Sequence, residues 1–107
     1  MRNDRPFLLI CDDDPLVQNL YSKHFGTSYN ALVAGYINTA ERHLRTHDVE
    51  VMILDVELST PREGVEAIER FLAIDPELAI VMSSGHMNFD IVRDALKFGA
   101  SDFVPKN

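Results

Sequence analysis

Short apolar runs alternate with amphipathic segments along the whole chain. The apolar runs are Phe7–Cys11, Ala31–Ala34, Val51–Leu54, Leu78–Met82 and the stretch around Phe103 and Val104. Runs of this length that are apolar throughout are typical of strands covered on both faces. Apolar residues at helical spacing dominate the segments between them. The alternation therefore predicts an α/β fold, a doubly wound parallel sheet of five strands with helices on both faces.

The expected helices carry recognisable start and stop signals. Asp14 is expected to cap the first helix, with Pro15 in its first turn and Gly26 at its end. Asn38 and Glu41 resemble a capping box and predict that a short second helix begins there. The third helical stripe is Val65, Ile68, Phe71 and Leu72, ending before Asp75-Pro76, and the fourth runs from Ile91 to Phe98 with Gly99 closing it.

Polar residues follow the apolar runs where each expected strand ends. Asp12 and Asp13 follow the first run, Asp55 the third, Ser84 the fourth and Lys106 the last. The carboxyl ends of parallel strands share one edge of the sheet, and ligands of such folds bind there. Residues far apart in the sequence should therefore converge at this edge.

The residue types at this edge favour one kind of chemistry. Adjacent carboxylates raise one another's pKa unless a cation compensates them. Oxygen ligands without His or Cys at metal-ligand spacing suit Mg²⁺ better than Zn²⁺. Magnesium, a lysine and a hydroxyl group around an aspartate together predict phosphoryl transfer, in which the aspartate itself can form an acyl phosphate. The weaker reading is that Asp12 to Asp14 are a helix cap with solvated neighbours, the role we expect for Asp14 itself.

Composition narrows the class of protein. The 107 residues fit one domain, and a formal net charge of −7 argues against a nucleic-acid surface. The single cysteine, Cys11, excludes an internal disulfide, and its apolar neighbours predict a buried, unreactive thiol. Without a leader sequence or a long apolar span, the sequence is expected to give a soluble, cytoplasmic protein.

Four stretches carry a family resemblance, namely ICDDDP, VMILDVEL, VMSSGH and FGASDFVPK. With these in order, the sequence resembles the receiver domain of bacterial two-component response regulators over essentially its whole length. The resemblance implies a flavodoxin-like fold and a phosphorylation-dependent signalling module that catalyses only its own phosphotransfer and dephosphorylation. The implied partners are a sensor histidine kinase or a histidine phosphotransfer protein, and an output domain or partner protein.

The resemblance also assigns a metal and phosphorylation site. It implies that Asp55 receives the phosphoryl group from a phosphohistidine and that Lys106 pairs with the phosphoryl oxygens. Asp13 would bind Mg²⁺ directly and Asp12 through water, with Asp55 and the backbone carbonyl of Glu57 as the remaining protein ligands.

A two-state switch is implied beside this site. Ser84 would swing to bond the phosphoryl group, and Phe103 would turn inward behind it. Ser83 and Ser84 cannot both face the site because successive strand residues point in opposite directions. The side chain of Glu57 and His86 are candidates for modulating the site entrance.

Three features depart from the family pattern. The loop after Asp55 is about one residue longer than usual, and Pro105 precedes Lys106 where the family has a proline after the lysine, so a cis bond is not assumed. The chain also ends at Asn107, where the family continues into a fifth helix. We therefore expect a domain of residues 1–107 truncated at its C-terminus, with bare apolar surface that leads to self-association or reduced stability.

Other functions compete with the receiver reading. A flavin or mononucleotide binder would want a Gly-rich phosphate loop after the first strand, where the three aspartates would repel phosphate. A Mg²⁺-dependent phosphohydrolase remains open because Glu57 lies two residues after Asp55, the place of a general acid/base. A degenerate receiver used only for binding is disfavoured by the intact acidic residues, Ser84 and Lys106.

Overall fold

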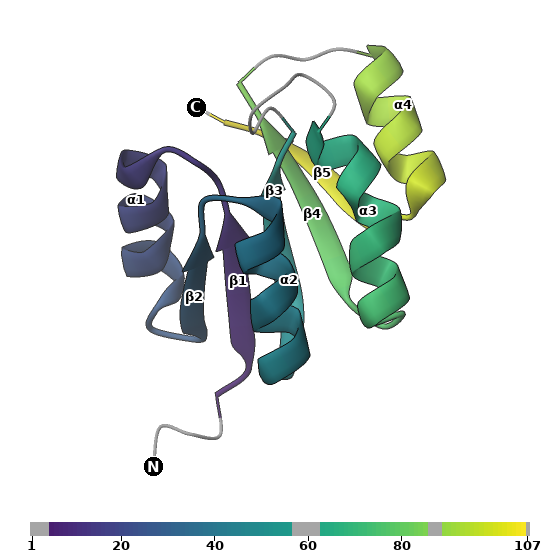
Figure 1. The fold of residues 1–107 in the computed structure, drawn as a ribbon. Helices are drawn as coiled ribbons and strands as arrows, with labels where there is room; N and C mark the ends of the chain where they lie inside the picture. Colours follow the sequence, from purple (N-terminus) through teal and green to yellow (C-terminus); the bar gives the residue numbers. More distant parts are fainter. Residues whose placement is uncertain (1–4, 57–62, 86–88, 107) are drawn as a thin grey trace.

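A single parallel sheet forms the centre of the molecule (Figure 1). The computed structural model describes residues 5–56, 63–85 and 89–106. Along the chain the elements are β1 (Phe7–Cys11), α1 (Pro15–Phe25), β2 (Asn30–Ala34), α2 (Ile37–Thr46), β3 (Val49–Asp55), α3 (Glu63–Ile74), β4 (Ala79–Ser84), α4 (Phe89–Phe98) and β5 (Asp102–Pro105). The strand order is β2-β1-β3-β4-β5 and every neighbouring pair is parallel. This order confirms the predicted flavodoxin-like, doubly wound sheet.

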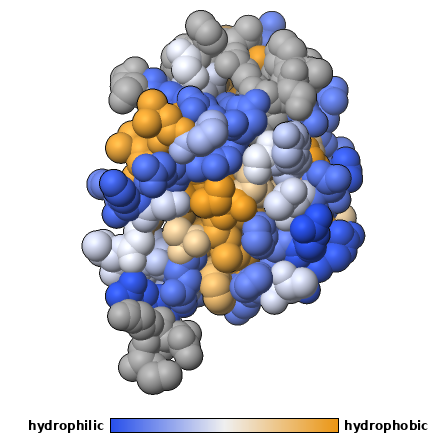
Figure 2. Space-filling model, turned by 60° about the vertical axis from the view of Figure 1, so that its left-hand side comes forward, coloured by the Kyte–Doolittle hydropathy of each residue, from blue (hydrophilic) through white to orange (hydrophobic). Residues whose placement is uncertain are grey.

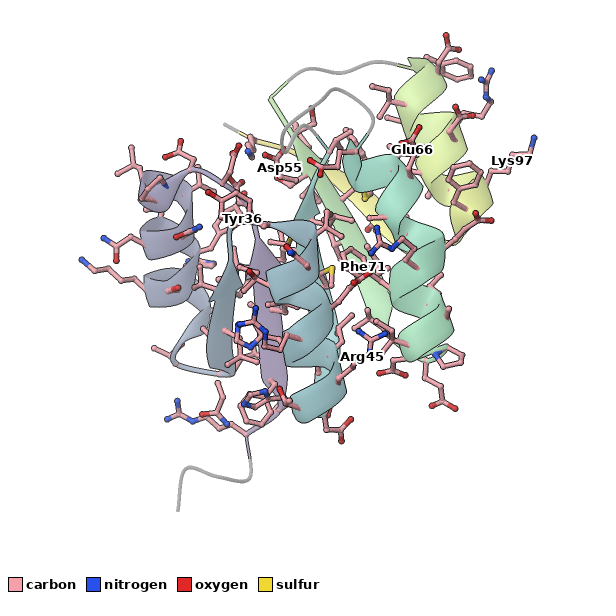
Figure 3. All side chains as sticks on the ribbon, in the orientation of Figure 1. Tyr36, Arg45, Asp55, Glu66, Phe71 and Lys97 are labelled. Carbon is pink, nitrogen blue, oxygen red and sulfur yellow. The ribbon has the colours of Figure 1, made fainter. Side chains whose placement is uncertain are left out.

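Apolar side chains form two layers, one on each face of the sheet. The larger cluster joins the sheet to α2, α3 and α4, and Phe71 of α3 points into it without exposed surface (Figure 3). Burying a side chain of this size contributes about 1.5–3 kcal/mol to folding. The smaller cluster joins the other face to α1 through Tyr21 and Phe25. The central strand β1 and the Met52–Leu54 part of β3 are covered on both faces, which explains why these stretches are apolar without alternation.

The start of α2 differs from its prediction. The helix begins at Ile37 after Tyr36, whose side chain makes no capping hydrogen bond, so the predicted Asn38–Glu41 capping box is wrong. Glu41 forms an ion pair with Arg70 of α3 at 2.7 Å instead. Three of the ten helix residues are buried, so apolar packing decides where this helix lies.

Several strand limits also differ from the apolar runs. β3 begins at Val49, earlier than the predicted Val51, and β4 is displaced towards Ser84. The polar residues Ser83 and Ser84 belong to β4 because they pair with β5 and are almost wholly buried. Pairing with a neighbouring strand extends a strand past its apolar residues, and a hydropathy pattern does not report that pairing.

The face that carries α1 is incompletely covered. A hollow of about 250 Å³ opens beside α1, and its lining is almost entirely apolar or aromatic: Leu8, Tyr21, Phe25, Tyr29, Val51, Ile53, Val81 and Val104. Figure 2, turned so that the left-hand side of Figure 1 comes forward, shows apolar surface between hydrophilic surroundings on this side of the molecule. Bare apolar surface was predicted from the sequence. Among the described helices none has the length and apolar character needed to cross a membrane.

Candidate metal centre

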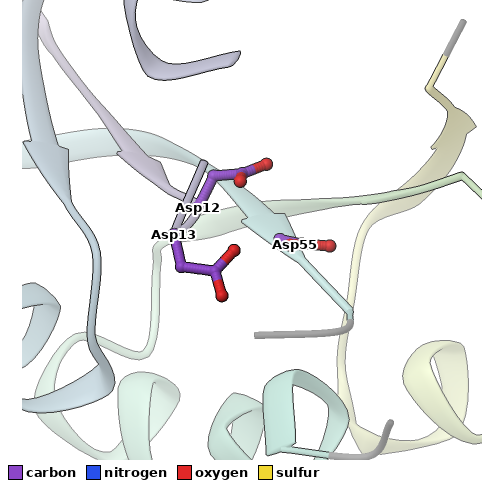
Figure 4. Close-up of side chains that lie close together, drawn as sticks. All are labelled: Asp12, Asp13 and Asp55. Atoms are coloured by element: carbon purple, nitrogen blue, oxygen red, sulfur yellow. The ribbon is translucent and has the colours of Figure 1, made fainter. Parts of the chain in front are cut away.

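Three carboxylates meet at the carboxyl edge of the sheet (Figure 4). Asp12 and Asp13 follow β1, Asp55 ends β3, and one oxygen from each lies within 4.8 Å of the other two. Asp12 and Asp55 keep only 2% and 4% of their surface exposed, whereas Asp13 is exposed. The predicted convergence of these residues is therefore present.

Hydrogen bonds and one ion pair hold both the backbone and the side chain of Asp12. Its backbone N–H donates to the carbonyl of Ala34 at 2.9 Å, and its own carbonyl accepts from Nε2 of Gln18 at 2.6 Å. Its Oδ1 accepts from the backbone N–H of Asp14 at 2.9 Å, and its Oδ2 lies 2.8 Å from Nζ of Lys106. Asp14 also accepts from the backbone N–H of Leu16 at 2.9 Å, which confirms its predicted role as the N-cap of α1. Asp13 has no hydrogen bond or ion pair with another described residue.

Lys106 brings a positive charge to the cluster from the end of β5. Its Nζ lies 2.8 Å from Asp12 and 3.4 Å from Asp55. Burial by itself lowers the pKa of Lys106, but the hydrogen bond to Asp12 and the attraction of both carboxylates raise this pKa above its ordinary value. The backbone N–H of Lys106 donates to the carbonyl of Ser84 at 2.7 Å, so strand pairing fixes where the lysine leaves the sheet.

The two serines at the end of β4 face opposite sides of the sheet. The Ser83 hydroxyl lies 3.4 Å from the Tyr21 hydroxyl of α1, on the face of the smaller apolar cluster. Ser84 follows it in the strand and therefore points the other way. The two serine side chains therefore face opposite sides of the sheet, as expected, and which of them serves the site stays a prediction. Phe103 on β5 pairs in register with Met82 and is half-buried against the larger cluster.

Gly64 allows α3 to begin directly against the strand that carries Asp55. A Cβ at this position would lie 2.4 Å from the Asp55 carbonyl oxygen and 3.0 Å from two backbone atoms of Val56. A side chain would therefore displace either the helix start or the strand end. The sequence pattern did not identify Gly64 as a site residue, because its role depends on this close approach in the folded chain.

Cys11 lies beside the cluster but is not part of it. It is fully buried in β1, as predicted, and carries no disulfide. Burial, together with the nearby carboxylates of Asp12 and Asp55, raises the pKa of its thiol to about 12. A thiol that stays protonated at neutral pH is a poor nucleophile and a poor metal ligand.

The side chains of the site fit a hard cation. All three clustered groups offer carboxylate oxygens, the ligand type that Mg²⁺ and Ca²⁺ prefer. The exposed Asp13 leaves one side of the cluster open to solvent, which suits a cation that keeps part of its water. Two expected residues, Glu57 and His86, lie outside the described residues.

Comparison with known proteins identifies the family of this chain. The family model of the response regulator receiver domain matches residues 8–107. The chain is 31% identical over 104 residues to a protein-glutamate methylesterase/protein-glutamine glutaminase from Bradyrhizobium diazoefficiens, covering 92% of this chain and 26% of that protein. It is 30% identical over 100 residues to the chemotaxis protein CheY of Listeria monocytogenes, covering 92% of this chain and 84% of that protein.

A solved structure agrees in fold. A response regulator protein from Burkholderia pseudomallei, whose crystal structure contains a phosphorylated aspartic acid and a calcium ion, matches with a TM-score of 0.86 at 21% identity. The match covers 96% of this chain and 60% of that one. The chain spans about a quarter of the length of the methylesterase relatives. Its sheet order, its acidic edge and a family match over almost its full length lead to one conclusion. This chain belongs to the family of receiver domains of two-component response regulators.

Proposed function

We propose that Asp55 is the phosphoacceptor of this receiver domain and that Mg²⁺ is its cation. The observation that carries the proposal is the convergence of Asp12, Asp13, Asp55 and Lys106 at one edge of the sheet. Bound Mg²⁺ would supply positive charge that offsets the phosphoryl oxygens and the carboxylates.

Asp55 acts as the nucleophile in this scheme. A carboxylate oxygen of Asp55 attacks the phosphorus of a phosphohistidine, a new P–O bond forms and the P–N bond breaks. The electron pair of the broken bond stays on the histidine nitrogen of the donor, and the product on Asp55 is an acyl phosphate. Asp55 is almost buried at the end of β3, so its position is fixed before the donor arrives.

The other charged residues of the site have different proposed roles in binding the cation and the phosphoryl group. Asp13 is exposed and has no described partner, which suits a direct cation ligand, with the Glu57 backbone carbonyl as a further ligand. The carboxylate of Asp12 is occupied by Lys106 and by the backbone N–H of Asp14, which suits a ligand acting through water. Lys106 already lies 3.4 Å from Asp55, so a small movement of its ammonium group would bring it onto the phosphoryl oxygens.

Ser84 and Phe103 form the proposed switch. The Ser84 hydroxyl bonds the new phosphoryl group, and the aromatic ring of Phe103 moves further into the apolar layer that it already touches. Phe103 lacks a hydroxyl group, so burying it leaves no polar atom unsatisfied. The change at this edge is passed to an output domain or a partner protein, and a cytoplasmic histidine kinase or phosphotransfer protein is the proposed donor.

The test is intact mass after incubation with acetyl phosphate. We expect a gain of about 80 Da that requires Mg²⁺ and is absent in Asp55→Asn. Asp14→Asn is the matched control, because it removes a neighbouring charge while keeping a good N-cap, and it should gain mass like the wild type. A folded wild type that gains no mass, or an Asp55→Asn variant that still does, would refute the assignment. Steady hydrolysis of a phosphate monoester would support the phosphohydrolase alternative instead.

A further inference from the structure

Gln18 connects α1 to the backbone of the metal cluster. Its side-chain Nε2 donates to the carbonyl oxygen of Asp12 at 2.6 Å. Its backbone N–H donates to the carbonyl of Asp14 at 3.0 Å as part of the first turn of α1. Gln18 is half-buried and lies on a helix, so a rigid element supports both contacts. One residue therefore holds the loop from Asp12 to Asp14 at both of its ends.

The peptide planes on either side of Asp13 are held by two hydrogen bonds, one from Gln18 and one to the Asp12 carboxylate. The plane before Asp13 contains the Asp12 carbonyl, which accepts from Gln18. The plane after Asp13 contains the Asp14 N–H, which donates to Oδ1 of Asp12. The two backbone dihedral angles of a residue are set by the planes that flank it. The side chain of Asp13 has no described partner, so the direction in which its carboxylate leaves the backbone depends on these two planes.

We propose that Gln18 is a positioning residue for the cation site, acting through the backbone of Asp13 rather than touching the cation. The inference rests on the proposed function, because it assumes that Asp13 binds a divalent cation. Outer contacts that orient metal ligands commonly change metal affinity by about ten- to a hundredfold when removed. Gln18 orients the backbone rather than a ligand side chain, so we expect the lower end of that range, about tenfold weaker Mg²⁺ binding.

Two variants and one control separate positioning from general stability. Gln18→Met keeps the length of the side chain and removes the amide, whereas Gln18→Asn keeps the amide and shortens its reach by one methylene. Asn19→Leu is the control, because Asn19 is the next amide residue on the same helix and is exposed. The Mg²⁺ dissociation constant is measured by isothermal titration calorimetry, and thermal unfolding is measured without metal.

The expected result is a dissociation constant raised about tenfold in both Gln18 variants and unchanged in Asn19→Leu. Lower thermal stability with an unchanged dissociation constant would assign Gln18 a structural role only and overturn the inference. If Gln18→Met does not fold, the comparison of Gln18→Asn with wild type decides the question. A folded wild type that binds no Mg²⁺ would refute the proposed function itself, which is a different outcome from normal binding in the variants.

Discussion

Removing one charge from the carboxylate cluster should stabilise the metal-free protein. Asp12, Asp13 and Asp55 each place an oxygen within 4.8 Å of the other two. Lys106 lies beside Asp12 and Asp55 and offsets part of their charge. Asp13 receives no such compensation from a described residue. Asp13→Asn therefore removes the least compensated charge of the cluster while keeping the size of the side chain.

The size of the expected stabilisation follows from the distance between the carboxylate oxygens. Two unit charges 4.8 Å apart repel by about 0.9 kcal/mol in water and by about 3.5 kcal/mol at an effective dielectric constant near 20. Asp13 is exposed, so the value near water applies to each of its two neighbours, and the charge of Lys106 beside them reduces the sum. We expect the free energy of unfolding to rise by about 1 kcal/mol, which is a rise in Tm of about 4–8 °C for a domain of this size.

Thermal unfolding in EDTA tests the charge repulsion within the cluster, and thermal unfolding with Mg²⁺ tests whether Asp13 contributes to cation binding. A cation at 100 times its dissociation constant stabilises a folded protein by about 2.7 kcal/mol. With Mg²⁺ the wild type should therefore gain more stability than Asp13→Asn, which lacks the carboxylate proposed as a direct ligand.

Asp14→Asn is the control for a simple change in net charge, since Asp14 caps α1 and Asn caps equally well. Its Tm in EDTA should stay close to that of the wild type. A lower Tm for Asp13→Asn in EDTA would show that charge repulsion does not destabilise the cluster. An undiminished response to Mg²⁺ would show that Asp13 is not a direct ligand of the cation.

Two further predictions concern the scaffold. Gly99→Ala should lower the free energy of unfolding by about 1–3 kcal/mol, because the φ of Gly99 is +120° and a Cβ would lie 2.5 Å from Leu72 Cδ1. Gly85→Ala, where a Cβ meets nothing within 4 Å, should change thermal unfolding little, and equal losses would contradict the strain argument. The wild type should self-associate through the hollow beside α1, which sedimentation velocity would detect. Val104→Glu, in the lining of the hollow, should weaken the self-association more than the control Leu96→Glu on α4. A monomeric wild type that melts cooperatively would disprove the idea.

The fold was predictable because several independent patterns agree with it. The apolar runs marked where the five strands lie along the chain, and Asp14 with Pro15 marked the start of α1 correctly. The cap of α2 could not be predicted, because that helix is positioned by burying Ile37, Ala40 and Leu44. A capping pattern reports only a local preference of about 1 kcal/mol, and apolar packing over a whole helix outweighs it.

The candidate site was predictable in its residues but not in its contacts. Asp12, Asp13, Asp55 and Lys106 stand at the ends of apolar runs, and parallel strands bring such ends to one edge. Nothing in the sequence indicated that Lys106 lies nearer to Asp12 than to Asp55, at 2.8 Å against 3.4 Å. In the strand order β5 is nearer to β3, which carries Asp55, than to β1, which precedes Asp12, so this preference reflects the path of the Lys106 side chain, which a sequence pattern does not contain.

The sequence by itself determined which residues are apolar, where strands end in carboxylates and, through the alternation of runs, that the sheet is parallel. The tertiary structure alone decided which side chains meet. Gln18 reaches the Asp12 carbonyl and Gly64 lies against Asp55 only after α1 and α3 have packed onto the sheet. The physical reason is that periodicity records which face of an element is buried, whereas a contact between two elements depends on their packing.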